Sequence, residues 1–293
     1  MEGQTHKLAC NQIVFLLTKS QPVKIQIIPS SIVSFVAKLR SVLVNIALLN
    51  LLFVMLMANA HSAQARATPN LQVFRDQIYD AYVLNNMPQW ARTLQAMEAA
   101  YRATPSAELL YDLLLAQYGI IGYYLGNNRQ NLGEPILQRA EALNETLEQT
   151  RGFQAQASAF QAAFIAFRIS LSPARAIIIG PRSANAANRA EQLNPQYPRV
   201  WVEKGNIQFF APAPFGSKRQ SITYYQRAIR LMEANMHPSH RWLYLSTLVS
   251  LANAFEKTGN IAMAIQTLEK ALQFEPRFSW AKDEMLPRLR AGQ

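Results

Sequence analysis

The hydrophobic positions in the last part of the chain follow a helical spacing on two consecutive segments. A turn at Lys257–Asn260, which contains Gly259, separates the segments, and Pro276 ends the second. Small residues recur where two helices would have to approach closely. The apolar positions are Leu245, Leu248, Leu251, Ala252 and Phe255 in the first segment, and Ala264, Leu268 and Ala271 in the second. The spacing predicts a pair of antiparallel helices.

Similar patterns recur upstream, as expected because one helix pair cannot cover its own apolar faces. Nothing after residue 66 alternates with a period of two. The predicted fold class is therefore all-α, a right-handed solenoid of about five antiparallel helix pairs with a C-terminal capping helix. The predicted units are about 72–105, 106–150, 153–195, 196–238 and 240–277, and the predicted cap is 278–290.

Two of the predicted turns are longer than in the last unit. The turn Phe209–Gly216 has four additional residues, and the turn Ser170–Pro181 has seven. Phe209, Phe210 and Phe215, with two prolines, make the first of these a stiff, apolar loop. Packing of this loop over its own repeat is the favoured interpretation, and a lip that binds a partner is the alternative.

The unit Leu245–Phe278 resembles the tetratricopeptide repeat (TPR), whose period is about 34 residues. That resemblance implies binding of a partner protein in a concave groove, which is lined by particular positions of each first helix. Carried onto this sequence, those positions are Ser246, Val249, Asn253, Glu256 and Lys257 in the last unit, and Arg199, Val202 and Asn206 in the unit before, next to Phe209. The amides of Asn206 and Asn253 would hydrogen-bond an extended peptide, or they simply face water.

A weaker resemblance covers about residues 185–290. The Pro-Phe-Gly turn leading into a helix is similar to the T-component of tripartite ATP-independent periplasmic (TRAP) transporters. This resemblance implies a solute-binding protein as partner, and an oligomer with a passage for a small apolar ligand.

The N-terminal part of the chain has the pattern of an export signal. Lys38 and Arg40 precede the uncharged stretch 41–60, and Ala-x-Ala sites end at Ala60 and Ala65. We expect a leader over 1–65, cleaved after Ala65, and a repeat domain over 66–293. The alternative is an uncleaved anchor at 41–60, because about 20 apolar residues can span a bilayer. Both interpretations place the repeat domain outside the cytoplasm, and the first predicts the periplasm.

Residues 1–37 are unusually long for the leader of a signal peptide. They mix apolar runs with Pro22 and Pro29. One hypothesis is that translation starts near Val36 or Leu39 at a non-AUG codon.

Composition and charge narrow the function. Hydrophobic residues make up 50% of the chain and charged residues 16%, which is enough for a core, and the net charge is +11. Removing 1–65 leaves 24 basic and 17 acidic residues, a net charge of +7. The basic residues are scattered one or two per helix, which argues against nucleic acid. The only cysteine is Cys10, so disulfides and cysteine metal sites are excluded.

No group of residues predicts catalysis. His237 and His240 form a weak metal pair, and the favoured interpretation is a loop with Ser239 as the N-cap of the next helix. The helical spacing of Glu141, Glu145 and Glu148 indicates a solvated face. We therefore predict no catalytic residue, cofactor or metal. Asn144 begins a formal glycosylation sequon, although nothing in the sequence indicates a eukaryotic secretory pathway.

The sequence as a whole predicts a non-enzymatic, exported scaffold that binds another envelope protein or a peptide segment. An accessory subunit of a TRAP-type transporter is the first alternative. An enzyme built on helices is the second, and it would need a hydrolase or lyase activity that survives mutation of the groove. Membrane contact is expected only through an uncleaved N-terminal segment, and the oligomeric state is open.

Overall fold

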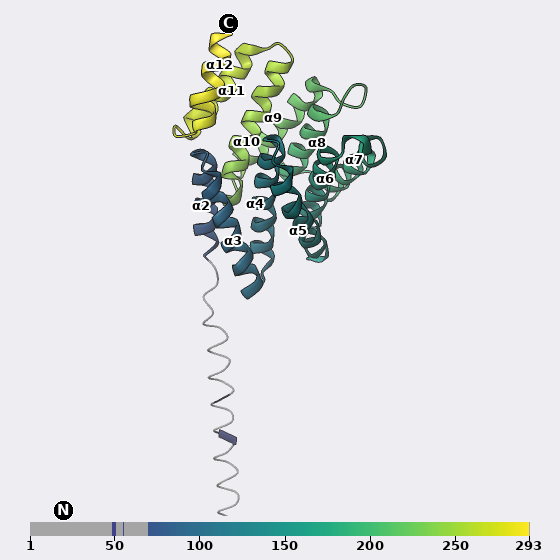
Figure 1. Ribbon diagram of the computed structural model, residues 1–293, viewed down its shortest axis with the longest axis vertical. Helices are drawn as coiled ribbons and strands as arrows, with labels where there is room; N and C mark the ends of the chain where they lie inside the picture. Colours follow the sequence, from purple (N-terminus) through teal and green to yellow (C-terminus); the bar gives the residue numbers. More distant parts are fainter. Residues whose placement is uncertain (1–48, 51–54, 56–69, 293) are drawn as a thin grey trace, which may run out of the picture. The chain divides into compact units, whose positions relative to one another are not determined.

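The computed structural model describes residues 49–50, 55 and 70–292, and the last of these ranges forms a stack of helix pairs (Figure 1). The five pairs are α2 (Leu71–Val83) with α3 (Met87–Ala103), α4 (Ala107–Gly126) with α5 (Gln130–Gln149), α6 (Gln154–Leu171) with α7 (Ala176–Leu193), α8 (Pro198–Phe210) with α9 (Lys218–Ala234), and α10 (Arg241–Lys257) with α11 (Ile261–Phe274). We call the first helix of each pair its A helix and the second its B helix. The predicted all-α fold of consecutive antiparallel pairs is confirmed.

Helix ends are set by local chemistry. Asn70, Asn86, Ser106, Ser217 and Asn260 each use a side-chain oxygen to accept a hydrogen bond from a backbone N–H in the first turn of the following helix. Gly259, in the last intra-pair turn, has φ of +80°, a left-handed conformation that favours glycine. These capping residues and the glycine mark where helices begin and end, so that short turns join them.

Small residues allow the two helices of a pair to pack closely. Ala252, Ala264 and Ala271 are completely buried between α10 and α11. In the preceding pair, a Cβ added to Gly205 of α8 would lie 2.5 Å from the ring of Tyr225 in α9. The close-packed positions predicted from spacing are therefore the ones that bring the helices together.

One predicted turn is wrong. The sequence predicts a long connection over residues 170–181, but only Ser172–Arg175 lie outside the two α-helices, and Pro173–Arg175 of this stretch form the short 3-10 helix η1. Helix α7 begins at Ala176 and continues through Pro181. The proline removes one backbone donor from the first part of the helix. The helix tolerates this loss because Ile177, whose carbonyl would have accepted that hydrogen bond, is exposed to water.

The C-terminal cap consists of two short pieces. A π-helical segment, η3 (Trp280–Met285), leads directly into α12 (Leu286–Ala291). Ala281, Met285, Leu286 and Leu289 are buried against the last pair. The apolar end of the stack is thereby covered.

Apart from residues 49–50 and 55, the predicted leader lies outside the described residues, and so do its cleavage site after Ala65 and the alternative start near Val36. Among the residues that the structure describes, no helix is both long enough and apolar enough to cross a membrane.

Candidate functional site

The A helices share an inner face, and the first and last pairs meet across it. Tyr79 Oη of α2 donates to Glu275 Oε2 at 3.0 Å, and Arg277 Nη2 lies 3.1 Å from Asp80 Oδ1. The ring of Tyr82 stacks on Phe278 with centroids 5.4 Å apart. These contacts, between residues nearly 200 positions apart in sequence, close the inner face on itself.

Aromatic rings fill the space where α3, α4 and α10 meet. Trp90 lies edge-on to Trp242 with ring centroids 5.0 Å apart, and its Nε1 donates to the carbonyl oxygen of Ala116 at 3.0 Å. Both indoles are buried. A concave groove in which a peptide could lie is therefore absent from this part of the described chain, because tryptophan side chains occupy the space.

A buried polar cluster lies beside these rings, at the N-terminal ends of the A helices. We call it the polar core and define it as Tyr111, Tyr197, Arg199, Glu203 and His240. The hydroxyl of Tyr111 lies 2.7 Å from that of Tyr197 and 2.5 Å from Nε2 of His240. All five residues are less than 8% exposed, so the cluster is part of the protein interior.

Arg199 is the central charge of the polar core. Its Nη2 lies 2.6 Å from Glu203 Oε1. Its guanidinium stacks between two rings, 4.3 Å from the centroid of Tyr118 and 3.9 Å from that of Phe160. Nε and Nη1 of Arg199, and Nδ1 of His240, have no hydrogen-bond partner among the described residues. The charge is therefore stabilised by one carboxylate and two aromatic faces.

Burial determines the protonation of the other groups in the polar core. It raises the pKa of Tyr197 to about 12 and the pKa of Tyr111 well above its ordinary value. Burial also lowers the pKa of His240 to about 3, because the charged imidazolium would lose its water. At neutral pH the phenols and the imidazole are uncharged.

The neighbouring Asp112 is held by two partners. Arg75 Nε donates to Asp112 Oδ2 at 2.6 Å, and the hydroxyl of Ser239 donates to Oδ1 at 2.5 Å. The prediction that Ser239 caps the following helix is wrong. His237 takes the N-cap position of the 3-10 helix η2 (Pro238–His240), and the Ser239 side chain turns toward Asp112 because a carboxylate is the stronger acceptor.

The histidines and glutamates considered as metal ligands or catalytic groups do not gather into one site among the described residues. His237 and His240 lie with ring centroids 5.2 Å apart, but no set of three or more ligating side chains occurs among the described residues. Glu141 accepts from Arg168 at 3.0 and 2.6 Å, and Glu148 pairs with Arg189 at 2.8 Å. Asn144 is buried, and its Nδ2 donates to the carbonyl oxygen of Ala157.

The residues predicted to bind a partner divide into two groups. Arg199 and Val202 are buried, with exposed fractions of 0% and 3%, so they cannot line an open surface in this structure. The amide of Asn206 is engaged within the chain: its Nδ2 donates to the Tyr118 hydroxyl at 3.2 Å, and its Oδ1 accepts from the Tyr225 hydroxyl at 2.9 Å. The amide expected to bind a peptide is therefore already hydrogen-bonded to two tyrosine hydroxyls of the same chain.

The remaining predicted residues are accessible. Ser246, Val249, Asn253 and Phe209 are half-buried, and Lys257 is exposed. Glu256 is half-buried and accepts from both Nη atoms of Arg288 in the cap, at 2.5 and 2.9 Å. Phe209, Asn253, Glu256 and Lys257 lie toward the C-terminal ends of α8 and α10, whereas Ser246 and Val249 lie in the N-terminal half and the middle of α10.

The phenylalanine loop is packed only in part. Phe209 packs against the core, while Phe210 and Phe215 are each 76% exposed. The favoured prediction that the loop covers its own repeat is therefore wrong for Phe210 and Phe215. The loop folds on itself through hydrogen bonds to the carbonyl oxygen of Pro212, which keeps both rings outside.

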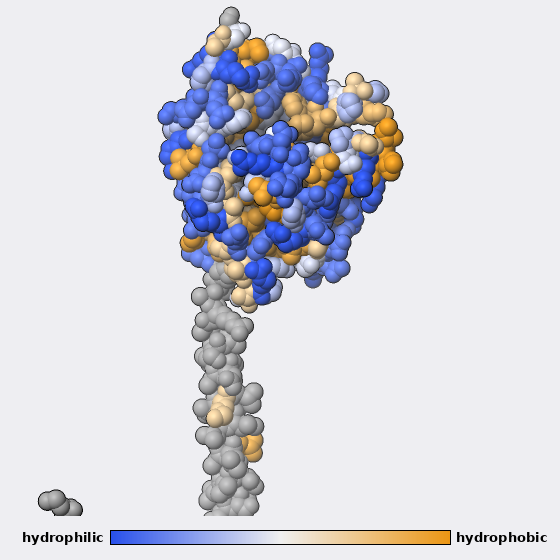
Figure 2. Space-filling model, in the orientation of Figure 1, coloured by the Kyte–Doolittle hydropathy of each residue, from blue (hydrophilic) through white to orange (hydrophobic). Residues whose placement is uncertain are grey.

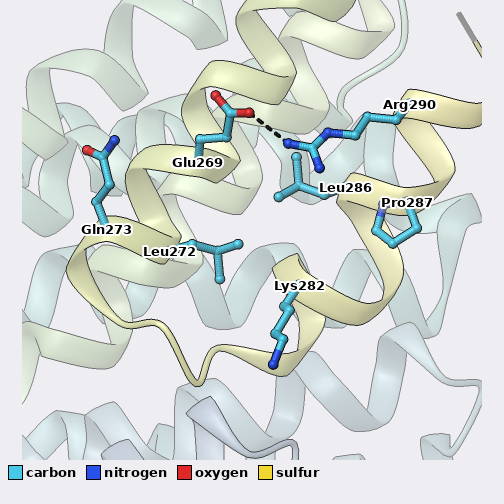
Figure 3. A pocket seen from close by; sticks show the side chains of 7 residues that line it. All are labelled: Glu269, Leu272, Gln273, Lys282, Leu286, Pro287 and Arg290. Atoms are coloured by element: carbon cyan, nitrogen blue, oxygen red, sulfur yellow. Dashed lines mark hydrogen bonds and ion pairs between the residues drawn. The ribbon is translucent and has the colours of Figure 1, made fainter.

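A surface hollow that sequence reasoning missed lies between α11 and the cap (Figure 3). Its volume is about 460 Å³, and the Glu269–Arg290 ion pair, at 2.8 Å, crosses one side. Leu272, Leu286 and Pro287 supply its apolar surface, and Lys282 lies at its edge. No motif marks it, because it arises where a non-repeating cap meets the last repeat.

Comparison with known proteins bears on the fold. No family model matches the chain, and no curated protein matches it in sequence. A solved structure, TTC0263, a thermophilic TPR protein of Thermus thermophilus, is similar with a TM-score of 0.50 and 16% identity, over 74% of this chain and 97% of that chain. The fold is TPR-like. The HusA haemophore from Porphyromonas gingivalis aligns with a TM-score of 0.48 and 16% identity, over 66% of this chain and 96% of that chain.

The TPR-like stack differs from the sequence expectation in one respect. The residue positions that the TPR resemblance assigns to a ligand groove face inward here too, but the first and last pairs meet and fill part of that face. Among the positions assigned to the groove, those of α10 stay accessible in part, whereas Arg199 and Val202 of α8 are buried.

Proposed function

We propose that this chain is a non-enzymatic protein-interaction scaffold of the cell envelope. The observation that carries the proposal is the TPR-like stack, whose inner face is accessible at one end. TPR-like folds present extended surfaces to partner segments. We call the accessible residues Phe209, Val249, Asn253 and Lys257 the open surface.

The open surface has the chemistry expected for a peptide segment. Val249 and Phe209 offer apolar area that is half-buried already, so it can be covered at little entropic cost. The Asn253 amide supplies a donor and an acceptor for backbone groups, and Lys257 supplies a charge at the edge. Glu256 can contribute only by exchanging its ion pair with Arg288.

Site-specific photo-crosslinking tests this assignment. A photoreactive amino acid is placed at Asn253 and, separately, at Phe209 in the full chain expressed in its native envelope. Gln266 on α11 is the matched control, because it is exposed on a B helix outside the inner face. The proposal expects one protein adduct shared by the first two positions and absent from the third.

The pattern of adducts decides between the functions. Equal labelling from all three positions, or labelling from Gln266 alone, would contradict the open surface as the binding site. A solute-binding protein as the single partner would instead support the accessory transport subunit.

Location is tested separately, by N-terminal sequencing of the protein recovered from cells. A mature chain that starts at Arg66 supports export and cleavage. Replacing Ala63 and Ala65 with bulky residues should block cleavage, because signal peptidases need small side chains there. Recovery of peptides from residues 1–30 in the mature protein would contradict both the cleavage and the alternative start.

A further inference from the structure

Four large apolar side chains protrude from two neighbouring turns. Ile177 and Ile178, in the first turn of α7, are 87% and 76% exposed, and Phe210 and Phe215, at the α8–α9 loop, are each 76% exposed. We call these four residues the apolar tip. Figure 2 shows hydrophobic surface at the right-hand edge, where Figure 1 places α7 and the α8–α9 loop.

The topology brings the two turns to the same edge. Successive A helices of a stack run parallel, so the turns that join each A helix to its B helix all lie on one side. Helices α7 and α8 are in contact, and Ile207 of α8 packs against Ala186 and Ala187 of α7. The two turns therefore form one continuous surface of neighbouring pairs.

The α8–α9 loop is built to hold its phenylalanines outward. The backbone N–H groups of Phe215 and Gly216 both donate to the carbonyl oxygen of Pro212, at 2.9 and 3.1 Å. A Cβ on Gly216 would lie 2.3 Å from the carbonyl oxygen of Ala211, so only glycine fits this closed turn. The ammonium of Lys218 donates to the carbonyl oxygen of Phe209 and fixes the base of the loop.

The charge around the apolar tip has one sign. Residues 149–190 and 204–232, which include both turns, contain no Asp or Glu. Arg175, Arg182 and Arg219 are exposed, and none of them forms an ion pair with a residue that the structure describes. Farther from the two turns, Arg168 and Lys204 are each paired with a glutamate. The arginines next to the apolar tip therefore keep their charges available for a partner.

We propose that the apolar tip and these three arginines dock on an anionic lipid surface. Interfacial membrane binding combines apolar side chains that enter the acyl boundary with cations that meet anionic headgroups. The region of the apolar tip has both parts, because four apolar side chains protrude and three exposed arginines lie in or beside the same two turns. Each arginine near such a surface strengthens binding about fivefold, and the effect falls as salt screens it.

Depth-sensitive labelling tests the docking in the full chain. Cys10 is the only cysteine, so a Cys10→Ser background allows single cysteines at Ile178, at Phe215 and, as a control, at Gln266. Each is labelled with an environment-sensitive fluorophore and mixed with vesicles of phosphatidylcholine, with and without phosphatidylglycerol. Quenchers attached to the acyl chains then report which labels enter the bilayer. The readout is independent of any tethering by the apolar stretch 41–60, because all three proteins contain it.

The proposal expects quenching at 178 and 215 on anionic vesicles, and none at 266. Labels at 178 and 215 that stay in water on anionic vesicles would overturn it, and so would a crosslink from these positions to an acidic protein in the envelope. Equal quenching on neutral vesicles would overturn the role of the arginines.

Two sets of variants separate insertion from charge. Ile177→Ser with Ile178→Ser should weaken vesicle binding, which is followed by quenching of the label at 215, by at least about tenfold. Arg175→Gln with Arg219→Gln should do so about 25-fold at low salt, and much less at high salt. The matched control is Val73→Ser with Leu193→Ser, which removes half-exposed apolar side chains elsewhere and should change nothing. A control as damaging as the tip variants would overturn the assignment.

Discussion

The polar core and the apolar tip are opposite exceptions to the rule that charged side chains face water and large apolar side chains are buried. The polar core buries Arg199, Glu203 and His240, which belong to types that normally reach water. The apolar tip exposes isoleucines and phenylalanines that would normally be covered. The difference lies in where the partners are. The buried groups are paired within the polar core, whereas the exposed side chains stay largely uncovered by the residues that the structure describes.

This contrast indicates that the polar core serves the fold and that the apolar tip serves contact with another molecule. Every member of the polar core contacts another member at hydrogen-bond distance, although Nε and Nη1 of Arg199 and Nδ1 of His240 have no partner among the described residues. The apolar tip stays mostly exposed, and its one ring contact among the described residues is that of Phe210 with Phe209, with centroids 4.9 Å apart. We infer that the polar core maintains the closed stack, and that the apolar tip is available for contact in addition to the open surface.

The largest expected effect comes from breaking the buried ion pair. Arg199→Ala leaves the Glu203 carboxylate buried without its cation, and we expect the free energy of unfolding to fall by about 3–5 kcal/mol. Denaturation by urea, followed by circular dichroism, measures the change. The control is Arg199→Met with Glu203→Leu, which removes both charges and should recover most of the loss. A single variant that costs less than about 1 kcal/mol would mean that water reaches the polar core.

A smaller effect is expected from close helix packing. Gly205→Ala places a methyl group 2.5 Å from the Tyr225 ring, and we expect a loss of about 2 kcal/mol because neither helix can move away. Gly126→Ala is the matched control, since nothing lies within 4 Å of an added Cβ there and the change favours helix. The same urea titration compares them. Equal effects would show that the pair packs more loosely than the structure indicates.

Gly205 also shows what the sequence could predict. Helix pairs are local, and their marks are local too: small residues such as Gly205 and Ala252 recur where helices touch, and turn residues recur between them. These marks lead to the correct fold class. The resemblance to the TPR also assigns Arg199 to the inner side of its A helix.

The closure of the inner face could not be predicted in the same way. It depends on how far each pair rotates relative to the last, which is a sum of small packing differences along five pairs. Tyr79 meets Glu275 only because of that sum. Repeat position alone therefore assigns Arg199 to a groove, although it is interior. Likewise, a loop containing phenylalanines looks the same in sequence whether the rings point in or out.

The contact that closes the stack gives an intermediate effect with a defined pH dependence. Hydrogen bonds from Arg277, and from Tyr79, hold the pKa of the Glu275 carboxyl at about 2, below its ordinary value of 4.5. Because the folded pKa is lower, the stabilisation is present above pH 4.5 and is lost as the pH falls toward 2. Glu275→Gln should therefore cost about 1 kcal/mol at pH ~7 and less at pH ~3. Unfolding titrations at both values measure it, and a cost that does not depend on pH would contradict the charged hydrogen bonds.

The smallest expected effect is at the apolar tip, and it sharpens the comparison most directly. Phe210→Ser with Phe215→Ser removes two rings that are each 76% exposed, so the free energy of unfolding should change by less than about 0.5 kcal/mol. Phe164→Ala, which removes a ring that is 2% exposed, is the matched control and should cost about 3 kcal/mol or more. Thermal and urea unfolding measure both. If the tip variant also loses more than about 1 kcal/mol, the two rings are covered in solution by the chain itself, and the edge is then no longer available for docking.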